Sequence, residues 1–246
     1  MSAQDSKKLN YDEIRESWEK RGQDDTVDIV KAKGDIFWDN YEKKVVSDVV
    51  NTGDRVLDVG CGTGRILEMI IKNGCEAYGI DYAKSCVMRC KTSYPKADVR
   101  EGLAESLPYE DSFFDVVVAV RTLQSMPEKE RKMNAFRDLV RVTKKNGHIV
   151  LIEGNAERLT GHPLYNYYLR EDEWSEIFKN AGVKLVKTGA IPLATLLSQF
   201  DREYCNFEIR RRYPEIYEQI YTLDQKAALT GLKRISHEFS FVLTKS

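Results

Sequence analysis

The sequence has few histidines, three in 246 residues, and its longest apolar runs, such as FFDVVVAV, are far too short to span a membrane. The N-terminal stretch MSAQDSKKLN lacks the apolar core of a signal peptide. Lysine and arginine total 38 against 39 aspartates and glutamates, so no strong field attracts nucleic acid or an anionic membrane. We therefore expect a soluble, cytoplasmic protein that recognises a small partner.

Cysteine is present but is not arranged for metal or disulfide chemistry. The five cysteines are odd in number and include no C-x-x-C pair, and no histidine–cysteine cluster has the spacing of a zinc site. Cys86 and Cys90 are one helical turn apart, and we expect both to face the core as reduced thiols. No metal is predicted.

From residue 55 onward, short β-branched runs alternate with helical patterns, which indicates a parallel sheet covered by helices on both faces. This predicts an α/β fold with a doubly wound, mostly parallel, seven-stranded sheet. The predicted helices are 64–73, 84–94, 128–143 and 170–182, and the predicted strands are 55–60, 76–81, 97–102, 114–121, 147–154, 183–191 and 237–245.

Two segments lie outside this alternation. Residues 1–50 show helical periodicity, and residues 192–236 are helical in pattern and rich in tyrosine. We predict a core of residues 51–191 and 237–246. The N-terminal segment 1–50 and the insertion 192–236 are predicted to be helical lids.

The stretch RVLDVGCGTGRILEMI places glycines at every second position between a strand and a helix. Gly60, Gly62 and Gly64 offer backbone amides and a helix N-terminus to a ligand. A dinucleotide fingerprint would need its third glycine where Arg65 stands. The carboxylate of Asp58 would repel a pyrophosphate and would suit a ligand that carries an ammonium group.

The motif VLDVGCGTGRIL resembles the first motif of class I S-adenosylmethionine-dependent methyltransferases. The similarity continues in order through YGIDYA, EGLAESLPYEDSFFDVVVAV and MNAFRDLVRVTKKNGHIVLIEGN, and it is strongest to the branch that includes ubiquinone and menaquinone biosynthesis methyltransferases. The resemblance implies a Rossmann-like methyltransferase fold, a methyltransferase activity and S-adenosylmethionine as the cofactor.

The same resemblance assigns residues to the cofactor. It places Asp58 near the amino group of the methionyl part. Asp81 would accept hydrogen bonds from both ribose hydroxyls, a bidentate arrangement that suits a carboxylate at a strand's end. The other implied cofactor contacts are Gly60, Cys61, Gly62, Gly64, Tyr82, Leu103, Ala104 and Glu105.

The adenine loop departs from the common pattern of the family. Many relatives have an aspartate where this sequence has Leu103, followed by Ala104 and Glu105. The adenine amino group must therefore be satisfied in another way, by Glu105 or by water.

Candidates for the reaction itself lie after the fourth and fifth strands. Arg121 and Glu153 end neighbouring strands, so both can reach the pocket floor. Either they form a salt bridge with each other, or Arg121 presents its fork to an anionic substrate. His162 follows the fifth strand and is either a titrating group at the substrate or a surface residue. Gln124 supplies a polar contact to the substrate.

The acceptor is expected to be a small molecule. The fourth strand ends in VRTLQ and lacks the DPPY or NPPY signature of methyltransferases that act on adenine or glutamine. Tyr165, Tyr168 and Tyr204 either form an aromatic wall over the substrate or belong to lid helices that pack on themselves. The run 210–212 of three arginines is typical of a solvated face rather than of an RNA site.

These observations predict methyl transfer from S-adenosylmethionine to oxygen, nitrogen or carbon of a small metabolite by in-line displacement. Two alternatives stay open: methylation of a tRNA or protein, and a cofactor-binding regulator without turnover. Neither nucleic acid nor a membrane is an expected partner, whereas a homodimer is left open.

Overall fold

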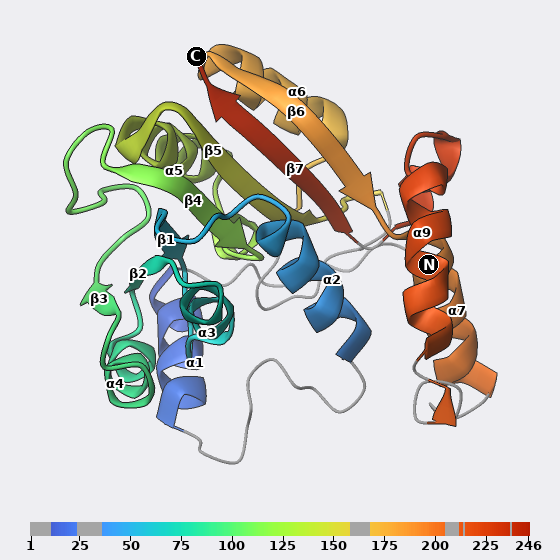
Figure 1. The fold of residues 1–246 in the computed structure, drawn as a ribbon, viewed down its shortest axis with the longest axis horizontal. Helices are drawn as coiled ribbons and strands as arrows, with labels where there is room; N and C mark the ends of the chain where they lie inside the picture. The colour runs from blue at the N-terminus through green and yellow to red at the C-terminus, as the bar shows by residue number, and fades with distance from the viewer. Residues whose placement is uncertain (1–10, 24–35, 158–167, 205–211, 214, 237) are drawn as a thin grey trace.

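The computed structural model describes residues 11–23, 36–157, 168–204, 212–213, 215–236 and 238–246. Seven strands form one sheet in the order β3-β2-β1-β4-β5-β7-β6 (Figure 1). Strands β1 to β5 pair in parallel, and β7 is antiparallel to both of its neighbours. The α/β, mostly parallel class is confirmed. The strands are β1 Arg55–Val59, β2 Glu76–Asp81, β3 Asp98–Glu101, β4 Phe114–Val120, β5 Thr143–Gly154, β6 Val183–Ala190 and β7 Glu238–Lys245.

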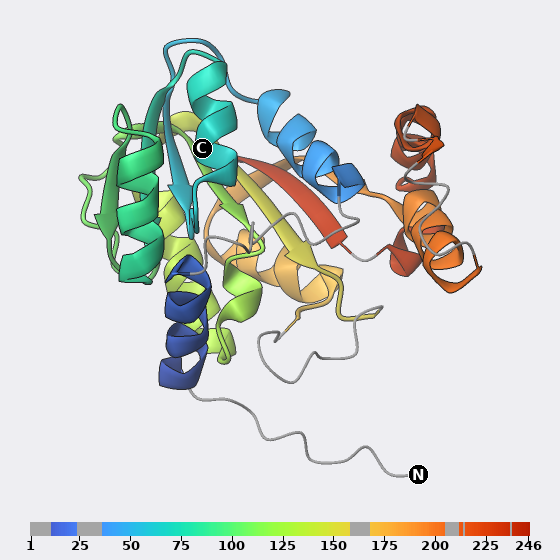
Figure 2. The same ribbon diagram turned by 90° about the horizontal axis from the view of Figure 1, so that it is seen from below.

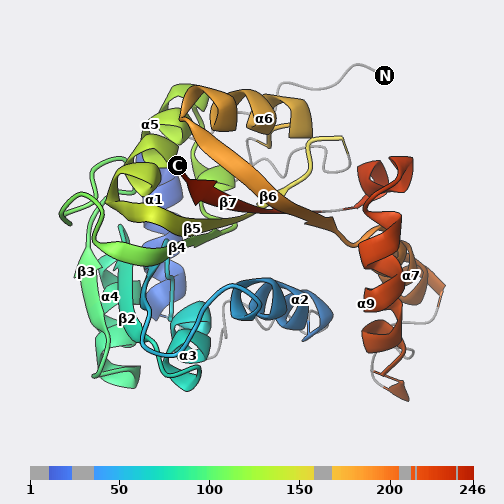
Figure 3. The ribbon, with the colours of Figure 1, turned by 45° about the horizontal axis from the view of Figure 1, so that its top comes forward.

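Helices cover both faces of the sheet, as Figure 2 shows. Helices α5 (Lys129–Val142) and α6 (Glu171–Asn180) lie on one face, and α2 (Ile36–Ser47), α3 (Arg65–Lys72) and α4 (Lys84–Ser93) lie on the other. Helix α1 (Tyr11–Gln23) packs against α4. Helices α7 (Pro192–Tyr204) and α9 (Glu215–Ala227) pack together beyond the opposite end of the sheet from α4 (Figure 3).

Side chains alternate between the two faces along each strand, as the pleat requires. Leu57 and Val59 join the core under α5 and α6, whereas Val56 joins the core under α2, α3 and α4. Cys90 is also fully buried in that second core, and Cys86 is buried on the same helix, which confirms the prediction for both thiols. The alternation puts Asp58 on the α3 side of the sheet.

The largest difference from the predicted bounds is at β5. This strand begins at Thr143, four residues before the predicted 147, and α5 ends at Val142. The Thr143 hydroxyl donates to the Leu139 carbonyl at 2.7 Å, while Thr143 pairs with Phe114. A left-handed Asn146 (φ 61°) then accompanies a register shift that lets the strand continue. None of the described helices is long and apolar enough to cross a membrane.

Candidate cofactor site

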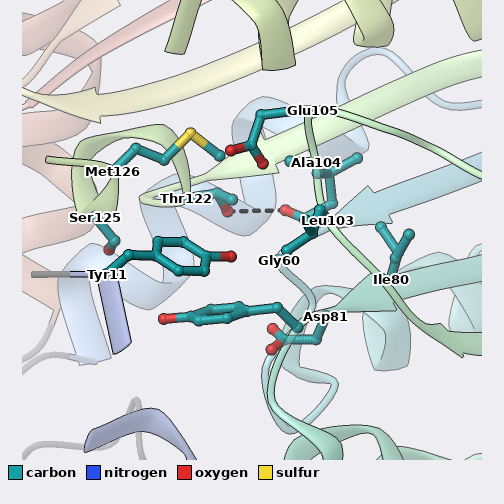
Figure 4. A pocket seen from close by; sticks show the side chains of 13 residues that line it. Tyr11, Gly60, Ile80, Asp81, Leu103, Ala104, Glu105, Thr122, Ser125 and Met126 are labelled. Atoms are coloured by element: carbon teal, nitrogen blue, oxygen red, sulfur yellow. Dashed lines mark hydrogen bonds between the residues drawn. The ribbon is translucent and has the colours of Figure 1, made fainter. Parts of the chain in front are cut away.

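A pocket lies where the carboxyl ends of β1, β2 and β4 meet (Figure 4). Its volume is about 420 Å³ when the open solvent at its mouth is included. This edge is where open parallel sheets bind their ligands. Thr122 fixes its floor, because its hydroxyl donates to the Val59 carbonyl at 2.8 Å. The pocket is lined by Tyr11, Val59, Gly60, Ile80, Asp81, Tyr82, Gly102, Leu103, Ala104, Glu105, Thr122, Ser125 and Met126.

The glycine loop needs glycine for two physical reasons. Gly60, Gly62 and Gly64 have φ values of 71°, 52° and 94°, which L side chains rarely adopt. A Cβ on Gly60 would also lie 2.4 Å from the Thr122 hydroxyl. Gly60 lines the pocket, while Gly62 and Gly64 lie behind it in the same turn, as does the buried Cys61.

Asp81 links the loop to the pocket. Its Oδ2 accepts a hydrogen bond from the Gly62 amide at 2.9 Å, and its Oδ1 accepts one from the Ala83 amide at 2.8 Å. Burial raises the pKa of this carboxyl to about 6, although these amides oppose the shift. Asp81 is therefore oriented by the backbone, and its oxygens keep further lone pairs for ligand hydroxyls.

Asp58 lies buried behind the glycine loop. Its Oδ2 has no hydrogen-bond partner among the described residues. Burial raises its pKa to about 8, with Arg65 opposing and Asp81 adding to the shift. An unpaired buried carboxylate oxygen is costly, so the site is built for a cationic donor such as an ammonium group.

Two tyrosines form one wall of the pocket. The rings of Tyr11 and Tyr82 lie 5.6 Å apart and tilted by 32°, and the guanidinium carbon of Arg131 lies 3.7 Å from the Tyr11 ring centre. Glu105, a candidate for the adenine amino group, pairs with Arg131 at 2.5 Å, while Leu103 lines the pocket nearby. The sequence reasoning missed Tyr11, whose only signal was an aromatic residue at the start of a predicted helix.

Comparisons with known proteins agree with this geometry. Residues 57–151 match the family model described as a methyltransferase domain. A 27-O-demethylrifamycin SV methyltransferase from Amycolatopsis mediterranei is 32% identical over 128 residues, covering 45% of this chain and 46% of its own. A demethylmenaquinone methyltransferase from Renibacterium salmoninarum is 32% identical over 113 residues, covering 45% and 46%. The chain carries a class I methyltransferase domain.

The relatives differ in what they methylate. A tRNA (carboxymethyluridine(34)-5-O)-methyltransferase from Arabidopsis thaliana is 28% identical over 107 residues, covering 44% of this chain and 26% of its own. The fold is shared with the [4+2]-cyclase SpnF, with a TM-score of 0.61 and 22% identity over 84% of this chain and 81% of that one. The chain spans about half the length of the first curated relatives that it matches.

S-adenosylmethionine is the cofactor of this domain, and the residues present fit it. Asp58, which does not itself line the pocket, has an unpaired buried oxygen that would suit its ammonium group, and the oriented carboxylate of Asp81 would suit its ribose hydroxyls. Gly60 presents backbone without a side chain to the pocket. Tyr82 and Leu103 line the same pocket, and the resemblance to the family implies that they would contact the adenine.

Cofactor binding should release a proton from Asp58. In the free protein its pKa of about 8 leaves the group largely neutral at pH 7, and a bound ammonium group favours the carboxylate. We expect up to about one proton released per S-adenosylhomocysteine bound at pH 7, where an α-amino group is mostly charged. The measurement is the dependence of calorimetric enthalpy on the buffer's ionisation enthalpy. Equal proton release by the Asp58→Asn variant would contradict the assignment.

Helix α1 is docked on the methyltransferase domain by Glu19. Its carboxylate accepts hydrogen bonds from the Lys84 and Ser85 amides, at 2.7 and 2.9 Å, and so caps the start of α4. Gly22 lets the two helices approach closely, because a Cβ there would lie 2.2 Å from the Ser85 hydroxyl. The contact carries Tyr11 into the pocket wall.

Removing this cap should weaken cofactor binding. A lost N-cap costs about 1 kcal/mol, so Glu19→Ala should lower S-adenosylhomocysteine affinity by about fivefold as α1 loosens. Glu16→Ala is the matched control on the same helix, because Glu16 pairs with Lys20 of the next turn and both side chains are exposed. Equal affinities for the two variants, measured by calorimetry, would show that α1 docking does not support the pocket.

Of the two alternatives for Arg121 and Glu153, the salt bridge between them is not formed. Arg121 adopts a left-handed φ of 55° at the end of β4, and its guanidinium pairs with Glu42 of α2 and with Glu238. Glu153 belongs to the opposite face, where it accepts hydrogen bonds from the Leu123 and Gln124 amides at 2.9 and 2.6 Å. The two side chains therefore lie on opposite faces of the sheet, Arg121 on the α2 side and Glu153 on the α5 side. Neither lines the described pocket.

The other substrate candidates are only partly brought together. The Gln124 side-chain oxygen accepts a hydrogen bond from the Gly154 amide at 2.8 Å, so it holds β5. Tyr168 packs on Gly154 and is half-buried. Tyr204 ends α7, is 75% exposed and does not line the pocket. His162 and Tyr165 fall outside the described residues.

Proposed function

We propose that the protein transfers the methyl group of S-adenosylmethionine to oxygen, nitrogen or carbon of a small metabolite. The observation that carries this proposal is the pocket itself, in which backbone amides orient the Asp81 carboxylate and Tyr11 of α1 forms part of the wall. A small acceptor reaches a methyl group held in such a pocket more readily than a macromolecule does. The near-zero net charge of the chain, −1, supports the same choice.

The bound cofactor supplies an electrophilic methyl group on a sulfonium. The chain's own residues bind and orient: Asp58 and Asp81 hold the two ends, and the loop from Thr122 to Met126 closes the floor. Orientation of this kind can supply roughly 7–11 kcal/mol toward the barrier. We propose residues 1–50 and 192–236 as lids: the first segment supplies Tyr11 to the cofactor pocket, and the second would cover only the acceptor side, because α7 and α9 do not line that pocket.

The deciding experiment begins with calorimetric titration of S-adenosylmethionine, S-adenosylhomocysteine and NAD. Micromolar affinity for the first two and none for NAD is expected. Label transfer from S-(trideuteromethyl)adenosylmethionine to a protein-free metabolite extract then tests turnover. Tight binding with no labelled product would favour a cofactor-binding regulator instead.

Methylation of a tRNA is the second candidate, favoured by the named tRNA methyltransferase among the relatives. It predicts an RNA complex whose affinity falls steeply with salt, because phosphate contacts release counterions. Label transfer to total tRNA, absent for the metabolite extract, would replace the small-molecule proposal.

A further inference from the structure

A row of charged side chains runs along the ligand-binding edge of the sheet, beside the cofactor pocket. Asp39 of α2 pairs with Arg65 at 2.9 Å, and Arg65 also contacts Glu42. Glu42 in turn lies 2.8 Å from Arg121 Nε, and Arg121 contacts Glu238. The row thus joins α3, α2, β4 and β7.

The position of this row is that of an acceptor site. Arg65 follows Gly64 of the glycine loop, and Arg121 precedes Thr122, which lines the cofactor pocket. Glu238, the first residue of β7, pairs in register with Gly154 at the end of β5. An acceptor must lie next to the cofactor on this edge, so the row borders the place where it binds.

The row has no surplus positive charge for an anionic acceptor. Both arginines are engaged by buried carboxylates, and Lys43 pairs with Asp39 at 2.8 Å. A carboxylate or phosphate would have to compete with these pairs. When Glu238 is ionised, as it is above its pKa of about 8, the row balances three positive groups, Lys43, Arg65 and Arg121, against three acids, Asp39, Glu42 and Glu238.

Glu238 has a vacant acceptor atom. Its side chain is buried, with 3% of the residue exposed, and Arg121 contacts Oε1. Its Oε2 has no hydrogen-bond partner among the described residues. Glu42 Oε1 also lacks a hydrogen bond of good geometry, but Arg121 Nε lies 2.8 Å from it, and Arg65 contacts Oε2. A buried carboxylate oxygen without a donor is rare and points to a donor that arrives with a ligand.

We propose that Glu238 Oε2 accepts a hydrogen bond from the acceptor and takes its proton, so that the acceptor is a hydroxyl or amine compound without negative charge. The inference rests on the proposed methyl transfer. The acceptor's oxygen or nitrogen forms a bond to the methyl carbon, the sulfur–methyl bond breaks and its electron pair goes to sulfur. The acceptor's proton moves to Glu238.

The electrostatic surroundings suit this role. Burial raises the pKa of Glu238 to about 8, with Arg121 opposing, Glu42 adding to the shift and Arg65 opposing. Tyr168 is a further titratable side chain in these surroundings: it interacts electrostatically with Arg121, Glu238 and Glu153. Since the carboxylate is the active form, kcat/KM should fall tenfold per pH unit below about 8.

The test uses the full chain with S-(trideuteromethyl)adenosylmethionine and a protein-free metabolite extract, with products identified by mass spectrometry. Label on a hydroxyl oxygen or an amine nitrogen is expected. A labelled methyl ester or a labelled anionic acceptor would overturn the inference while leaving the proposed function intact. No labelled product, with S-adenosylhomocysteine still bound, would overturn both.

Variants then test the residue on the identified product. Glu238→Gln should lower kcat by about 100-fold and flatten the pH profile, with S-adenosylhomocysteine affinity unchanged. Glu238→Asp, which keeps the charge, should recover part of the rate and the pH dependence, and it also serves if the glutamine variant fails to fold. Glu42→Gln is the comparison variant: it removes a charge that raises the pKa of Glu238, so the acid limb should move to lower pH while its slope of one is kept. An unchanged profile in Glu238→Gln would overturn the inference.

Discussion

The Asp81→Ala variant is expected to lose S-adenosylhomocysteine binding by at least about 100-fold. Each hydrogen bond to a charged group is worth about 1.5–3 kcal/mol, and this carboxylate would lose two from the ribose. The variant also loses the hydrogen bond that the Gly62 amide donates to Asp81 Oδ2. This loss should loosen the glycine turn, which would hold the methionyl part of the cofactor. Calorimetric titration measures the affinity, and urea unfolding checks that the fold survives.

The affinity for S-adenosylhomocysteine should depend on the charge and acceptor oxygens of Asp81 rather than on the volume of its side chain. Asp81→Asn keeps one acceptor oxygen and should lose less affinity than the alanine variant. Asp98→Ala is a matched control at the start of neighbouring β3, where the side chain is exposed and pairs with Arg100. Its affinity should equal that of the wild type. Binding by Asp81→Ala at wild-type strength would remove Asp81 from the cofactor site.

The pH dependence of affinity gives a further check on Asp81. Its folded pKa of about 6 is raised by burial, so the ribose-binding carboxylate is present above that value. Affinity for S-adenosylhomocysteine should therefore decline as pH falls through 6. In Asp81→Asn the contribution of this carboxyl should be absent, so that below pH 6 affinity falls less steeply than in the wild type and only the dependence set by Asp58 remains.

The parts of this protein that could be predicted are those determined by local sequence. The strand ends, the glycine turn and Asp81 occupy fixed offsets in one βαβ unit, so spacing alone places them at one edge. The glycines were predictable because a left-handed φ needs them. Asp58 was predictable as an acid beside the loop. The structure adds that its Oδ2 is buried without a hydrogen-bond partner among the described residues, which suits a ligand that brings a donor.

The contacts that could not be predicted join segments far apart in the chain. Tyr11 enters the pocket because Glu19 caps α4, a pairing of residues 65 positions apart that no local pattern encodes. Arg121 and Glu153 were both expected at the pocket floor, where a salt bridge between them was one of two alternatives, because their strands are neighbours. Side-chain alternation and the left-handed φ of Arg121 send the two to opposite faces instead. Strand adjacency therefore predicts proximity of backbones, not of side chains.

The buried pair of Lys132 and Glu153 carries the second large effect. Lys132 is fully buried on α5, and its ammonium group donates to the Leu123 carbonyl. Glu153 accepts from the amides of Leu123 and Gln124. Burial lowers the pKa of Lys132 to about 7 and raises that of Glu153 to about 7, and each charge opposes the other's shift. The pair thus holds the turn that follows β4.

Breaking this pair should cost stability and also cofactor affinity. Lys132 and Glu153 interact electrostatically through the turn that both contact. Removing one of two oppositely charged buried groups leaves the other uncompensated, which costs about 3–5 kcal/mol for directly paired groups. We expect Lys132→Met to lower the free energy of unfolding by about 3 kcal/mol on that ground. Its affinity for S-adenosylhomocysteine should fall as well, because the turn supplies Ser125 and Met126 to the pocket.

The double variant Lys132→Met, Glu153→Gln separates pairing from packing. If the two groups act together, its loss of stability should be smaller than the sum of the single losses by roughly 1–3 kcal/mol. Lys129→Met is the matched control, because Lys129 lies on the same helix and makes only a half-exposed pair with Glu173 at 3.5 Å. Such surface pairs contribute about 0–1 kcal/mol. Additive losses in urea unfolding, or an equal loss in Lys129→Met, would mean that the turn is held by its backbone contacts alone.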